Sequence, residues 1–267
     1  MFLLVALVLF ALGDPVNGAG VQKIVGGDSV DSNIIFDVLP PEVANWFISP
    51  QKHPYFAALR RRPSGADRFW AIVSPLLYCT SFCGGTIVHE RWILTAAHCL
   101  EGESAQNIEV VVGATAFLCS SEKIISVKKM FVHNRYSGKN DDYFDDIALL
   151  ELTTPITFSK RAQPIRIAKT TISDNRRVEI IGYGQTESGS GSKRLMHAQT
   201  QTVPFTRCAR FGRVDEDRQI CIGAGPIAGE GDSGGPAVAW KNGNLYQYGI
   251  VSYGDTTNGM FPSSNAV

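Results

Sequence analysis

One stretch of the chain, Gly229–Pro236 (GEGDSGGP), carries the clearest chemical pattern. A serine, Ser233, stands there among four glycines, next to a carboxylate, and a proline closes the stretch. Glycine permits tight turns and close approach of another molecule to the main chain, so Ser233 is displayed as a candidate nucleophile. A serine hydroxyl stays protonated near neutral pH, so it needs a base within hydrogen-bond reach and a group that orients that base. We therefore look for both partners in the rest of the chain.

The position of the histidines restricts the choice of base. All five precede Ser233 in the chain, namely His53, His89, His98, His133 and His197. The pattern Gly231-x-Ser233-x-Gly235 also matches the nucleophile elbow of α/β-hydrolases, but those enzymes place their histidine after the serine. The order therefore argues against a lipase or esterase of that class.

His98 has the most informative surroundings of the five histidines. It lies in Leu94–Cys99 (LTAAHC), where small residues pack around it and the following cysteine offers a disulfide anchor. A lone histidine is more often structural or at the surface, so its role depends on a partner. Asp146 is a suitable partner, because it precedes the apolar run Ile147–Leu152 and can be carried into the interior to accept a hydrogen bond from an imidazole. The alternative, a strand-capping aspartate in a polar loop, suits the neighbouring aspartates better.

Short strands are the elements that must position these residues. Brief apolar runs, many rich in β-branched residues, alternate with clusters of Gly, Pro, Ser and Asn, which favours strands over helices. The predicted strands cover residues 55–59, 85–88, 92–94, 108–112, 124–127, 147–152, 178–181, 197–203, 237–240 and 246–251. Lys241–Asn244 predicts a hairpin turn. The segment Asp28–Pro50 predicts an irregular surface loop, or alternatively a short helix over Val43–Phe47.

The composition fits a folded chain with a substantial core. Its 267 residues are 44% hydrophobic and 19% charged, which is enough for one large or two small domains. Lys+Arg and Asp+Glu both total 25, and this balance gives no indication of nucleic-acid or membrane binding. The six cysteines are typical of a disulfide-bonded secreted chain. Neither a Cys-x-x-Cys nor a His-x-x-x-His pair occurs, so we expect no metal site and no cofactor.

The amino end has the features of a secretory signal. Met1–Leu12 is almost entirely apolar but too short to span a bilayer, and small residues follow it. We predict a signal peptide over residues 1–18, a propeptide over residues 19–23, and secretion of the chain. An apolar helix of the mature protein is the alternative for the first segment. Lys23 then precedes Ile24–Gly27 (IVGG) as a plausible cleavage point.

The order His98, Asp146, Ser233 is the order of the catalytic triad in chymotrypsin. The chain resembles the trypsin/chymotrypsin (S1-type) family of serine proteases in four motifs, which follow one another as in that family. These motifs are Ile24–Gly27 (IVGG), Thr95–Cys99 (TAAHC), Asp146–Leu150 (DIALL) and Gly231–Pro236 (GDSGGP). Gly182–Gly184 (GYG) and Ser252–Gly254 (SYG) resemble two further motifs, with tyrosine where tryptophan is commoner.

The resemblance implies an all-β fold of two six-stranded Greek-key β-barrels of the chymotrypsin type. We place the first barrel at residues 24–158, with His98 and Asp146, and the second at residues 159–267, with Ser233. Ser233 would attack a peptide carbonyl, His98 would take its proton, and Asp146 would orient the imidazole. The N–H groups of Gly231 and Ser233 would form an oxyanion hole. The implied partners of this monomer are protein or peptide substrates, an activating protease and protein inhibitors.

Asp232 has a different implied role, as part of an activation switch. Cleavage after Lys23 would free the α-amine of Ile24, which would insert and pair with Asp232, and so convert a zymogen into an enzyme.

The family pattern also implies disulfides. It pairs Cys83 with Cys99, and Cys208 with Cys221. Two cysteines then remain, and their loops lie side by side in the family fold, so we expect a third disulfide. This third pair is Cys79–Cys119.

The chain departs from the family at the specificity pocket. The residue six before the nucleophile stands at the base of that pocket, and here it is Ile227, followed by Ala228. An isoleucine cannot neutralise the buried Lys or Arg side chain that trypsin-like enzymes accept, so we expect cleavage after apolar or small side chains. Ser252, Tyr253 and Gly254 would line the same pocket.

The carboxyl end is a second departure. After Gly254 only residues 255–267 remain, and neither the family's pocket-wall strand nor its closing helix is recognisable in them. We therefore expect an incomplete second barrel with an open edge. A second function is then conceivable, in which a catalytically impaired homologue acts as a binding or decoy protein.

Overall fold

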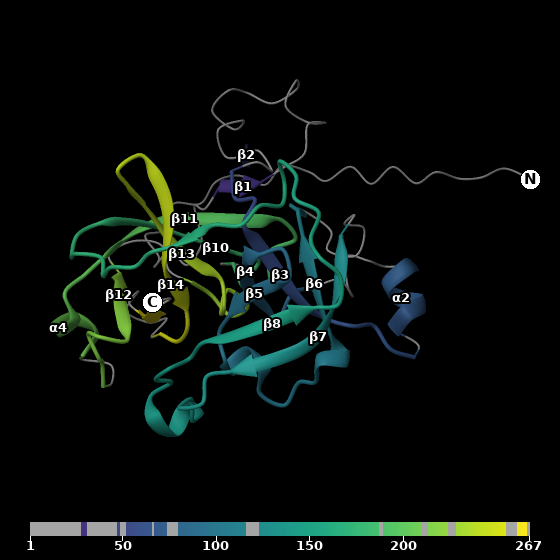
Figure 1. Ribbon diagram of the computed structural model, residues 1–267, viewed down its shortest axis with the longest axis horizontal. Coiled ribbons are helices and arrows are strands. Elements are labelled where there is room, and N and C mark those ends of the chain that lie inside the picture. Colours follow the sequence, from purple (N-terminus) through teal and green to yellow (C-terminus); the bar gives the residue numbers. More distant parts are fainter. Residues whose placement is uncertain are drawn as a thin grey trace, which may run out of the picture.

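The computed structural model consists of two β-barrels that lie side by side, the first in blue and teal and the second in green and yellow (Figure 1). It describes residues 28–30, 47–48, 52–65, 67–73, 80–115, 123–186, 189–209, 213–223, 228–254 and 261–265. The all-β, two-barrel fold expected from the sequence is confirmed. Across these described ranges, every helix is too short or too polar to span a membrane.

The first barrel closes through six strands that pair in the order β3-β4-β5-β8-β7-β6. Their bounds are β3 Phe56–Arg61, β4 Cys83–His89, β5 Trp92–Thr95, β6 Ile108–Val112, β7 Ile124–Val132 and β8 Ala148–Leu152. Successive side chains on a strand point to opposite faces, so one set of aliphatic residues fills the interior. Leu59, Ile87 and Leu150 belong to this set and are fully buried.

The second barrel is built from six strands that follow one another by pairing, in the order β10-β13-β14-β15-β12-β11, with β11 pairing back to β10. Their bounds are β10 Arg177–Gly182, β11 Leu195–Thr202, β12 Gln219–Gly223, β13 Pro236–Lys241, β14 Asn244–Val251 and β15 Phe261–Asn265. The short strand β9 (Arg166–Ile167) pairs with β14 in parallel. The expected hairpin turn at residues 241–244 does join β13 to β14.

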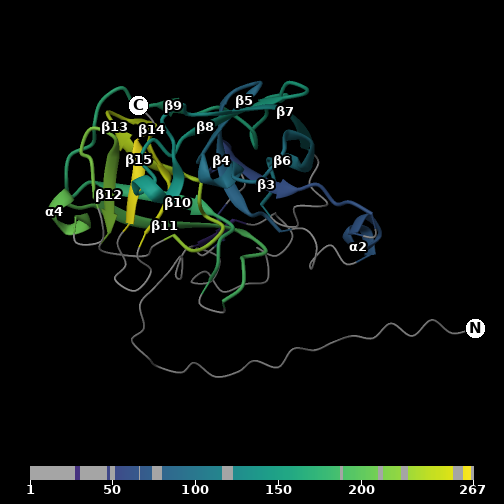
Figure 2. The same ribbon diagram turned by 90° about the horizontal axis from the view of Figure 1, so that it is seen from below.

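Helices are few and short. The 3-10 helices are η1 (His98–Leu100), η2 (Ala105–Asn107) and η3 (Gly138–Asp141), and the α-helices are α2 (Asp67–Val73) and α4 (Phe205–Cys208). Figure 2 shows α2 standing away from the first barrel and α4 at the far end of the second. The centre of the molecule is therefore formed by strands and loops.

The expectation that no strand follows Gly254 is wrong. Strand β15 pairs antiparallel with β12 on one side and with β14 on the other. It therefore fills the edge that we expected to be open. Its backbone hydrogen bonds with two neighbours define it, and such long-range pairing leaves little trace in the local sequence.

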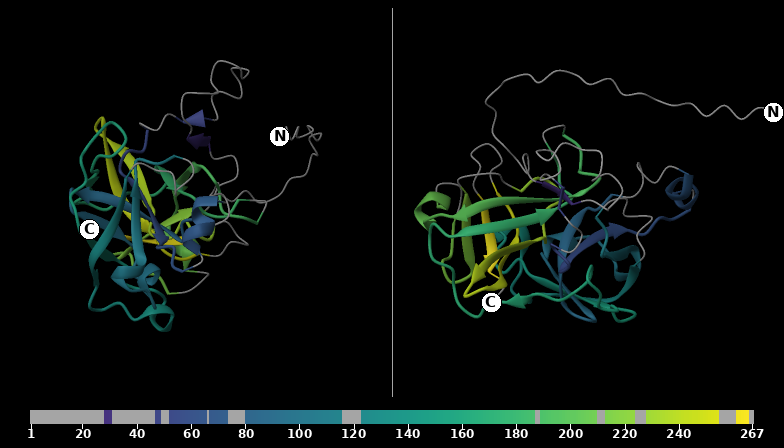
Figure 3. Two further views of the ribbon diagram at one scale, coloured as in Figure 1. Left: turned by 90° about the vertical axis from the view of Figure 1, so that its right-hand side faces the viewer. Right: turned by 90° about the horizontal axis from the view of Figure 1, so that it is seen from above.

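The segment Asp28–Pro50 also differs in part from the loop that we expected. Asp28–Val30 forms strand β1, which pairs with β11, and Phe47–Ile48 forms strand β2, which pairs with β1 in parallel. Figure 3 shows these two short purple strands at the edge of the second barrel. The alternative helix over 43–47 lies almost wholly outside the described residues, and its last residue is in a strand.

Two of the three expected disulfides are present. Cys83 on β4 is bonded to Cys99 in η1, and Cys208 in α4 is bonded to Cys221 on β12. The first bond ties the residue after His98 to the wall of the first barrel. Cys79 and Cys119 lie outside the described residues, as do the predicted signal peptide, Lys23, Ile24 and Ile227.

The two barrels meet through close backbone contact beside Ser233. The Gly84 N–H donates a hydrogen bond to the Ser233 carbonyl oxygen at 2.7 Å, and the Gly84 carbonyl accepts one from Thr95 Oγ1 at 2.8 Å. A Cβ atom added at Gly84 would lie 2.8 Å from the Gly235 Cα atom. The first barrel therefore has a glycine at a point where the serine loop of the second barrel comes close to its backbone.

We predict that Gly84→Ala lowers the free energy of unfolding by about 1–3 kcal/mol, because the new methyl group meets backbone that cannot move aside cheaply. Urea denaturation at equal protein concentration measures this loss. Gly191→Ala is the matched control, since its Cβ would lie 3.3 Å from the Tyr183 carbonyl oxygen and require a smaller adjustment. Equal midpoints for Gly84→Ala and the unmodified protein would contradict the close contact.

Candidate active site

The serine loop is held in one conformation by backbone hydrogen bonds. The Gly235 N–H donates to the Asp232 carbonyl at 2.9 Å, and the Gly234 N–H donates to the Val251 carbonyl at 2.7 Å. Gly231 and Gly234 have φ values of +95° and +79°, which L side chains rarely adopt. The turn therefore needs glycine on both sides of the Asp232–Ser233 pair, as the sequence pattern indicates.

His98 is fixed by Asp146 through two hydrogen bonds. Its ring Nδ1 lies 2.7 Å from Asp146 Oδ2, and its backbone N–H donates to Asp146 Oδ1 at 2.8 Å. Asp146 is completely buried, whereas the His98 side chain is 21% exposed. A carboxylate accepts hydrogen bonds, so Nδ1 carries the proton of the neutral imidazole and Nε2 keeps a lone pair. This is the protonation state in which His98 can act as a base.

Ser252, which follows strand β14 of the second barrel, links the His98–Asp146 pair to Ser233. The Ser252 hydroxyl donates a hydrogen bond to Asp146 Oδ2, and the Ser252 carbonyl oxygen lies 3.5 Å from Ser233 Oγ. Ser233 is also next to the segment that leads to His98, because a Cβ at Gly234 would overlap the Thr95 hydroxyl. The structure thus brings His98, Asp146 and Ser233 to one place, although no hydrogen bond joins His98 to Ser233 in the described part of the chain.

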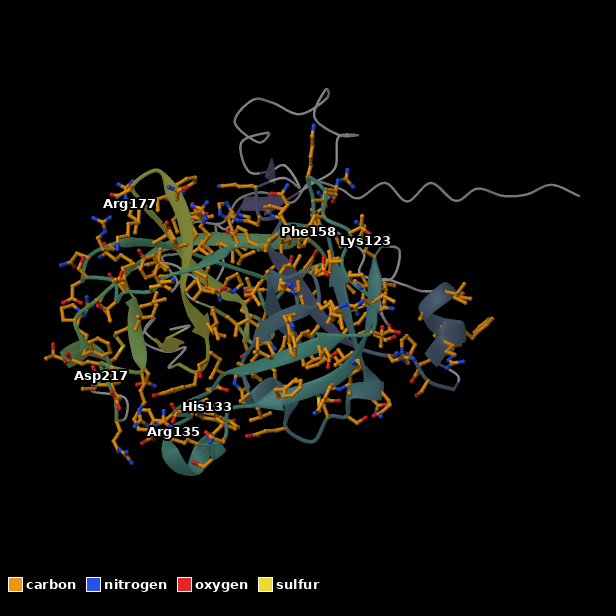
Figure 4. All side chains as sticks on the ribbon, in the orientation of Figure 1. Lys123, His133, Arg135, Phe158, Arg177 and Asp217 are labelled. Atoms are coloured by element: carbon orange, nitrogen blue, oxygen red, sulfur yellow. A yellow bond between two sulfur atoms is a disulfide. The ribbon has the colours of Figure 1, made fainter. Side chains whose placement is uncertain are left out.

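The loop before Asp146 has an unusual backbone. Asp142, Tyr143 and Asp145 all have φ near +50°, the left-handed region that costs non-glycine residues free energy. Asp145 is held by ion pairs with Arg135 at 3.2 Å and with Arg218 at 3.3 Å. Figure 4 shows Arg135 beside η3, next to the loop. These pairs link both barrels to the loop, which explains how the strained turn persists.

The backbone N–H groups of Gly231 and Ser233 are available to a ligand. Neither donates a hydrogen bond within the described residues, although both belong to a tightly folded loop. Unpaired N–H groups beside a nucleophile can stabilise a negatively charged oxygen. The oxyanion hole expected from the sequence stays a prediction for these two N–H groups.

Asp232 is a second buried carboxylate, with different surroundings. It accepts hydrogen bonds from the Gly184 N–H at 2.7 Å and the Gly229 N–H at 2.8 Å. A Cβ at Gly182 or Gly184 would overlap its carboxyl group, so the Gly182–Gly184 motif provides the space that Asp232 occupies. Burial raises the pKa of Asp232 to about 7, and the two backbone hydrogen bonds oppose this increase. No cation pairs with Asp232 among the described residues.

Two tyrosines beside His98 form an aromatic wall. The Tyr143 ring lies 5.9 Å from the His98 ring and stacks on Tyr253 at 5.3 Å. The Tyr253 hydroxyl accepts a hydrogen bond from Gln219 at 3.2 Å. Tyr253 was expected at a substrate site. Tyr143 was not predicted from the sequence, because its position depends on the left-handed backbone of its loop.

The remaining predicted residues are placed as follows. Ser252 is buried, Ala228 and Tyr253 are partly buried, and Gly254 is exposed. Ile227 lies outside the described residues, so its place in a pocket stays a prediction. Cys83 and Cys99 lie near His98 but are bonded to each other, so neither offers a thiolate to a metal ion.

Comparison with known proteins finds one matching family model and several similar chains. The family model described as Trypsin matches residues 49–264, which includes most of β15. "Trypsin, alkaline C" of Manduca sexta is 35% identical over 228 residues, 81% of this chain and 82% of that protein. "Trypsin 5G1" of Aedes aegypti is 33% identical over 183 residues, 65% of each chain. "Serine protease grass" of Drosophila melanogaster is 29% identical over 251 residues, 83% of this chain and 63% of that protein.

The buried Asp232 leads to a prediction about pH. Between about pH 4 and pH 7 the unfolded chain releases a proton from Asp232 that the folded, uncleaved chain retains, because burial raises the folded pKa from 3.8 to about 7. The free energy of unfolding therefore falls as pH rises through this window, by on the order of 4 kcal/mol in total. Urea denaturation of the uncleaved protein across this range measures the slope.

Asp232→Asn is the comparison variant for this experiment. The amide can accept only one of the two N–H hydrogen bonds, which lowers stability by an amount that does not vary with pH. The unmodified protein should therefore lose stability relative to Asp232→Asn as pH rises. Parallel pH curves for the two proteins would contradict the raised pKa.

Proposed function

The chain belongs to the trypsin family of serine proteases, and from this premise we propose that it is a secreted serine endopeptidase made as a zymogen. The observation that carries the proposal is the fully buried Asp146, which holds both the ring and the backbone N–H of His98. A buried carboxylate that orients a partly exposed imidazole beside a serine is the arrangement that nucleophilic catalysis needs.

The proposed reaction is peptide-bond hydrolysis in two steps. Ser233 Oγ attacks the peptide carbonyl carbon while His98 Nε2 takes the hydroxyl proton, and the proton then passes to the leaving amine. In the second step His98 takes a proton from water, the water oxygen attacks the acyl carbon, and the proton returns to Ser233 Oγ as the ester bond breaks. Asp146 keeps the imidazole in the required tautomer and stabilises the imidazolium. The N–H groups of Gly231 and Ser233 stabilise the oxyanion, and each such donor typically lowers the barrier by about 2.7–4 kcal/mol.

Asp232 is the proposed activation switch. A buried carboxylate without a cation is unfavourable, as its raised pKa indicates. Cleavage after Lys23 would create an α-amine on Ile24 that can pair with it and hold Gly231 and Ser233 in place. Strand β1, which begins four residues after Ile24, already pairs with β11 of the second barrel. The new amino end would therefore start close to the barrel that carries Asp232.

We further propose a preference for apolar or small side chains at the cleavage site. Ile227 cannot provide the negative charge that a Lys or Arg side chain needs in a buried pocket. The relatives named trypsins are similar in sequence over most of the chain, but this one residue decides the charge at the pocket base. Tyr143 and Tyr253 add an apolar wall beside His98, which favours an apolar residue next to the scissile bond.

The alternative function, an impaired homologue that acts by binding, has less support. Its main argument was a missing wall of the second barrel, and β15 now occupies that edge. The precise hydrogen bonding of His98 and Asp146 would also have no purpose in a protein that only binds.

We predict that the protein cleaved after Lys23 reacts with a fluorophosphonate probe at Ser233. Ser233→Ala should abolish labelling, and Asp146→Asn should lower kcat by about 10⁴-fold, because the imidazole then adopts the wrong tautomer. Lys23→Gln should leave the secreted protein uncleaved and almost unlabelled. Strong labelling of Lys23→Gln would contradict the switch, and absence of Ser233-dependent labelling from the cleaved protein would favour the binding protein.

A peptide-library cleavage profile tests the specificity. The activated protein should cleave after apolar or small residues and leave Lys and Arg sites largely intact, because no carboxylate is expected at the pocket base. Ile227→Asp should raise the share of cleavage after Lys and Arg relative to the unmodified protein. A tryptic profile from the unmodified protein would show that Ile227 does not line the pocket.

A further inference from the structure

A second cluster of ionisable side chains lies at the contact between the barrels. His53 precedes β3 of the first barrel, whereas Glu179 on β10 and His197 on β11 belong to the second. The two histidines are 4% and 2% exposed, and the Glu179 side chain is 16% exposed. The cluster consists of other residues than the site described above.

The strand register explains how two of these residues meet. Ile181 lies opposite His197 in the antiparallel β10–β11 pair, and Glu179 lies two residues before Ile181. Residues two apart on a strand share a face, so Glu179 and His197 are diagonal neighbours on one side of the sheet. The turn before β3 then adds His53 from the first barrel. No local spacing in the sequence predicts this grouping.

His53 has a nitrogen that lacks a protein partner. Its Nδ1 lies 2.9 Å from the Tyr55 hydroxyl, but its Nε2 is buried without a hydrogen-bond partner among the described residues. Glu179 Oε2 lies 4.0 Å from this Nε2, which is too far for a hydrogen bond. If Nδ1 carries the proton, Nε2 presents a lone pair to a carboxylate, which is unfavourable unless a cation lies between them.

A second contact of His53 fits a role as a metal ligand. Neutral imidazole and carboxylate are the forms that bind divalent metals. The Tyr55 hydroxyl fixes the ring of His53 through its other nitrogen, as the partners of metal-binding histidines usually do.

The spacing of the three ligand atoms is close to that of a tetrahedral site. Metal–ligand bonds of about 2.0–2.2 Å at tetrahedral angles separate ligand atoms by about 3.4 Å. Glu179 Oε2 lies 3.7 Å from His197 Nδ1 and 4.0 Å from His53 Nε2, and all three atoms lie within 4.8 Å of one another. The three atoms are spaced more widely than in an ideal site, so they must move closer together when the ion binds.

We propose that His53, Glu179 and His197 bind a zinc ion that joins the two barrels, with water as the fourth ligand. Two imidazoles and one carboxylate are a donor set that suits zinc, whereas calcium and magnesium prefer oxygen ligands alone. The ion links the residue before β3 to β10 and β11. It also lies beside the place where β1 pairs, since Asp28 is opposite His197 in the β1–β11 register. The ion therefore lies at the edge of the second barrel that holds the amino-terminal strand.

Zinc binding to the full chain tests the proposal directly. The His98→Gln background removes the partly buried imidazole of the candidate active site as a competing zinc ligand, and it prevents self-digestion. Competition with a fluorescent chelator should show one zinc ion per chain, and zinc should raise the melting temperature. Calcium and magnesium should have little effect. If this protein binds no zinc in the assay, the site does not exist.

Variants in the same background show which residues bind the ion. Loss of a group that merely supports a ligand weakens metal binding by about 10–100-fold, so Tyr55→Phe should have an effect of that size. His53→Gln and Glu179→Gln should weaken binding by at least about 100-fold, because each removes a ligand. His89→Gln changes an exposed histidine and should leave the affinity unchanged. Equal zinc affinity in His53→Gln and His89→Gln would overturn the assignment.

A spectroscopic measurement keeps the test decisive if a ligand variant fails to fold. Cobalt(II) bound in place of zinc should give the intense visible absorption of a tetrahedral site, without any change to His53, Glu179 or His197. The weak spectrum of an octahedral ion would show that the metal is bound elsewhere, and would overturn the proposal.

Discussion

The carboxylate of Asp146 is the group on which the candidate active site depends. A fully buried ionised carboxylate costs several kcal/mol unless hydrogen bonds replace the water that it loses. Asp146 receives three such bonds, from the His98 ring, the His98 backbone N–H and the Ser252 hydroxyl. Two of these donors come from the first barrel and one from the second. The charge is therefore stable only when the barrels are together and His98 is correctly turned.

Asp232 is a buried carboxylate with a different set of partners. It is equally buried, but its donors among the described residues are two backbone N–H groups and no cation. Its pKa consequently rises to about 7, whereas the fold provides Asp146 with the ring of His98. A carboxylate that is buried without a cation is strongly stabilised when a positive charge is later placed beside it. Asp146 therefore already has its partners in place, whereas the proposed cleavage after Lys23 would supply a cation to Asp232.

Much of the fold and the arrangement of the candidate site could be predicted from the sequence, because short motifs carry them. Each motif meets a need of the local backbone or of the core. Examples are the glycines around Ser233, the cysteine after His98 and the aspartate before an apolar run. Strand β15 was missed for a physical reason: Phe261–Asn265 (FPSSN) contains a proline and polar residues and has no apolar alternation. Tyr143 and the cluster around His53 were missed because contacts between distant segments, rather than local patterns, place them.

The contact between the barrels contributes both to the stability of the fold and to the hydrogen bonds of the candidate active site. Apolar residues from both sides fill it, including Phe56 and Val111 from the first barrel and Ile181 and Val238 from the second. The Ser233 carbonyl accepts its hydrogen bond across this contact from Gly84, close to where Ser252 reaches Asp146. Separation of the barrels would therefore expose apolar surface and leave a buried carboxylate short of a donor at the same time. Each barrel alone has a core, but the polar groups of the site are satisfied only by the pair, which is why the candidate chemistry lies between them.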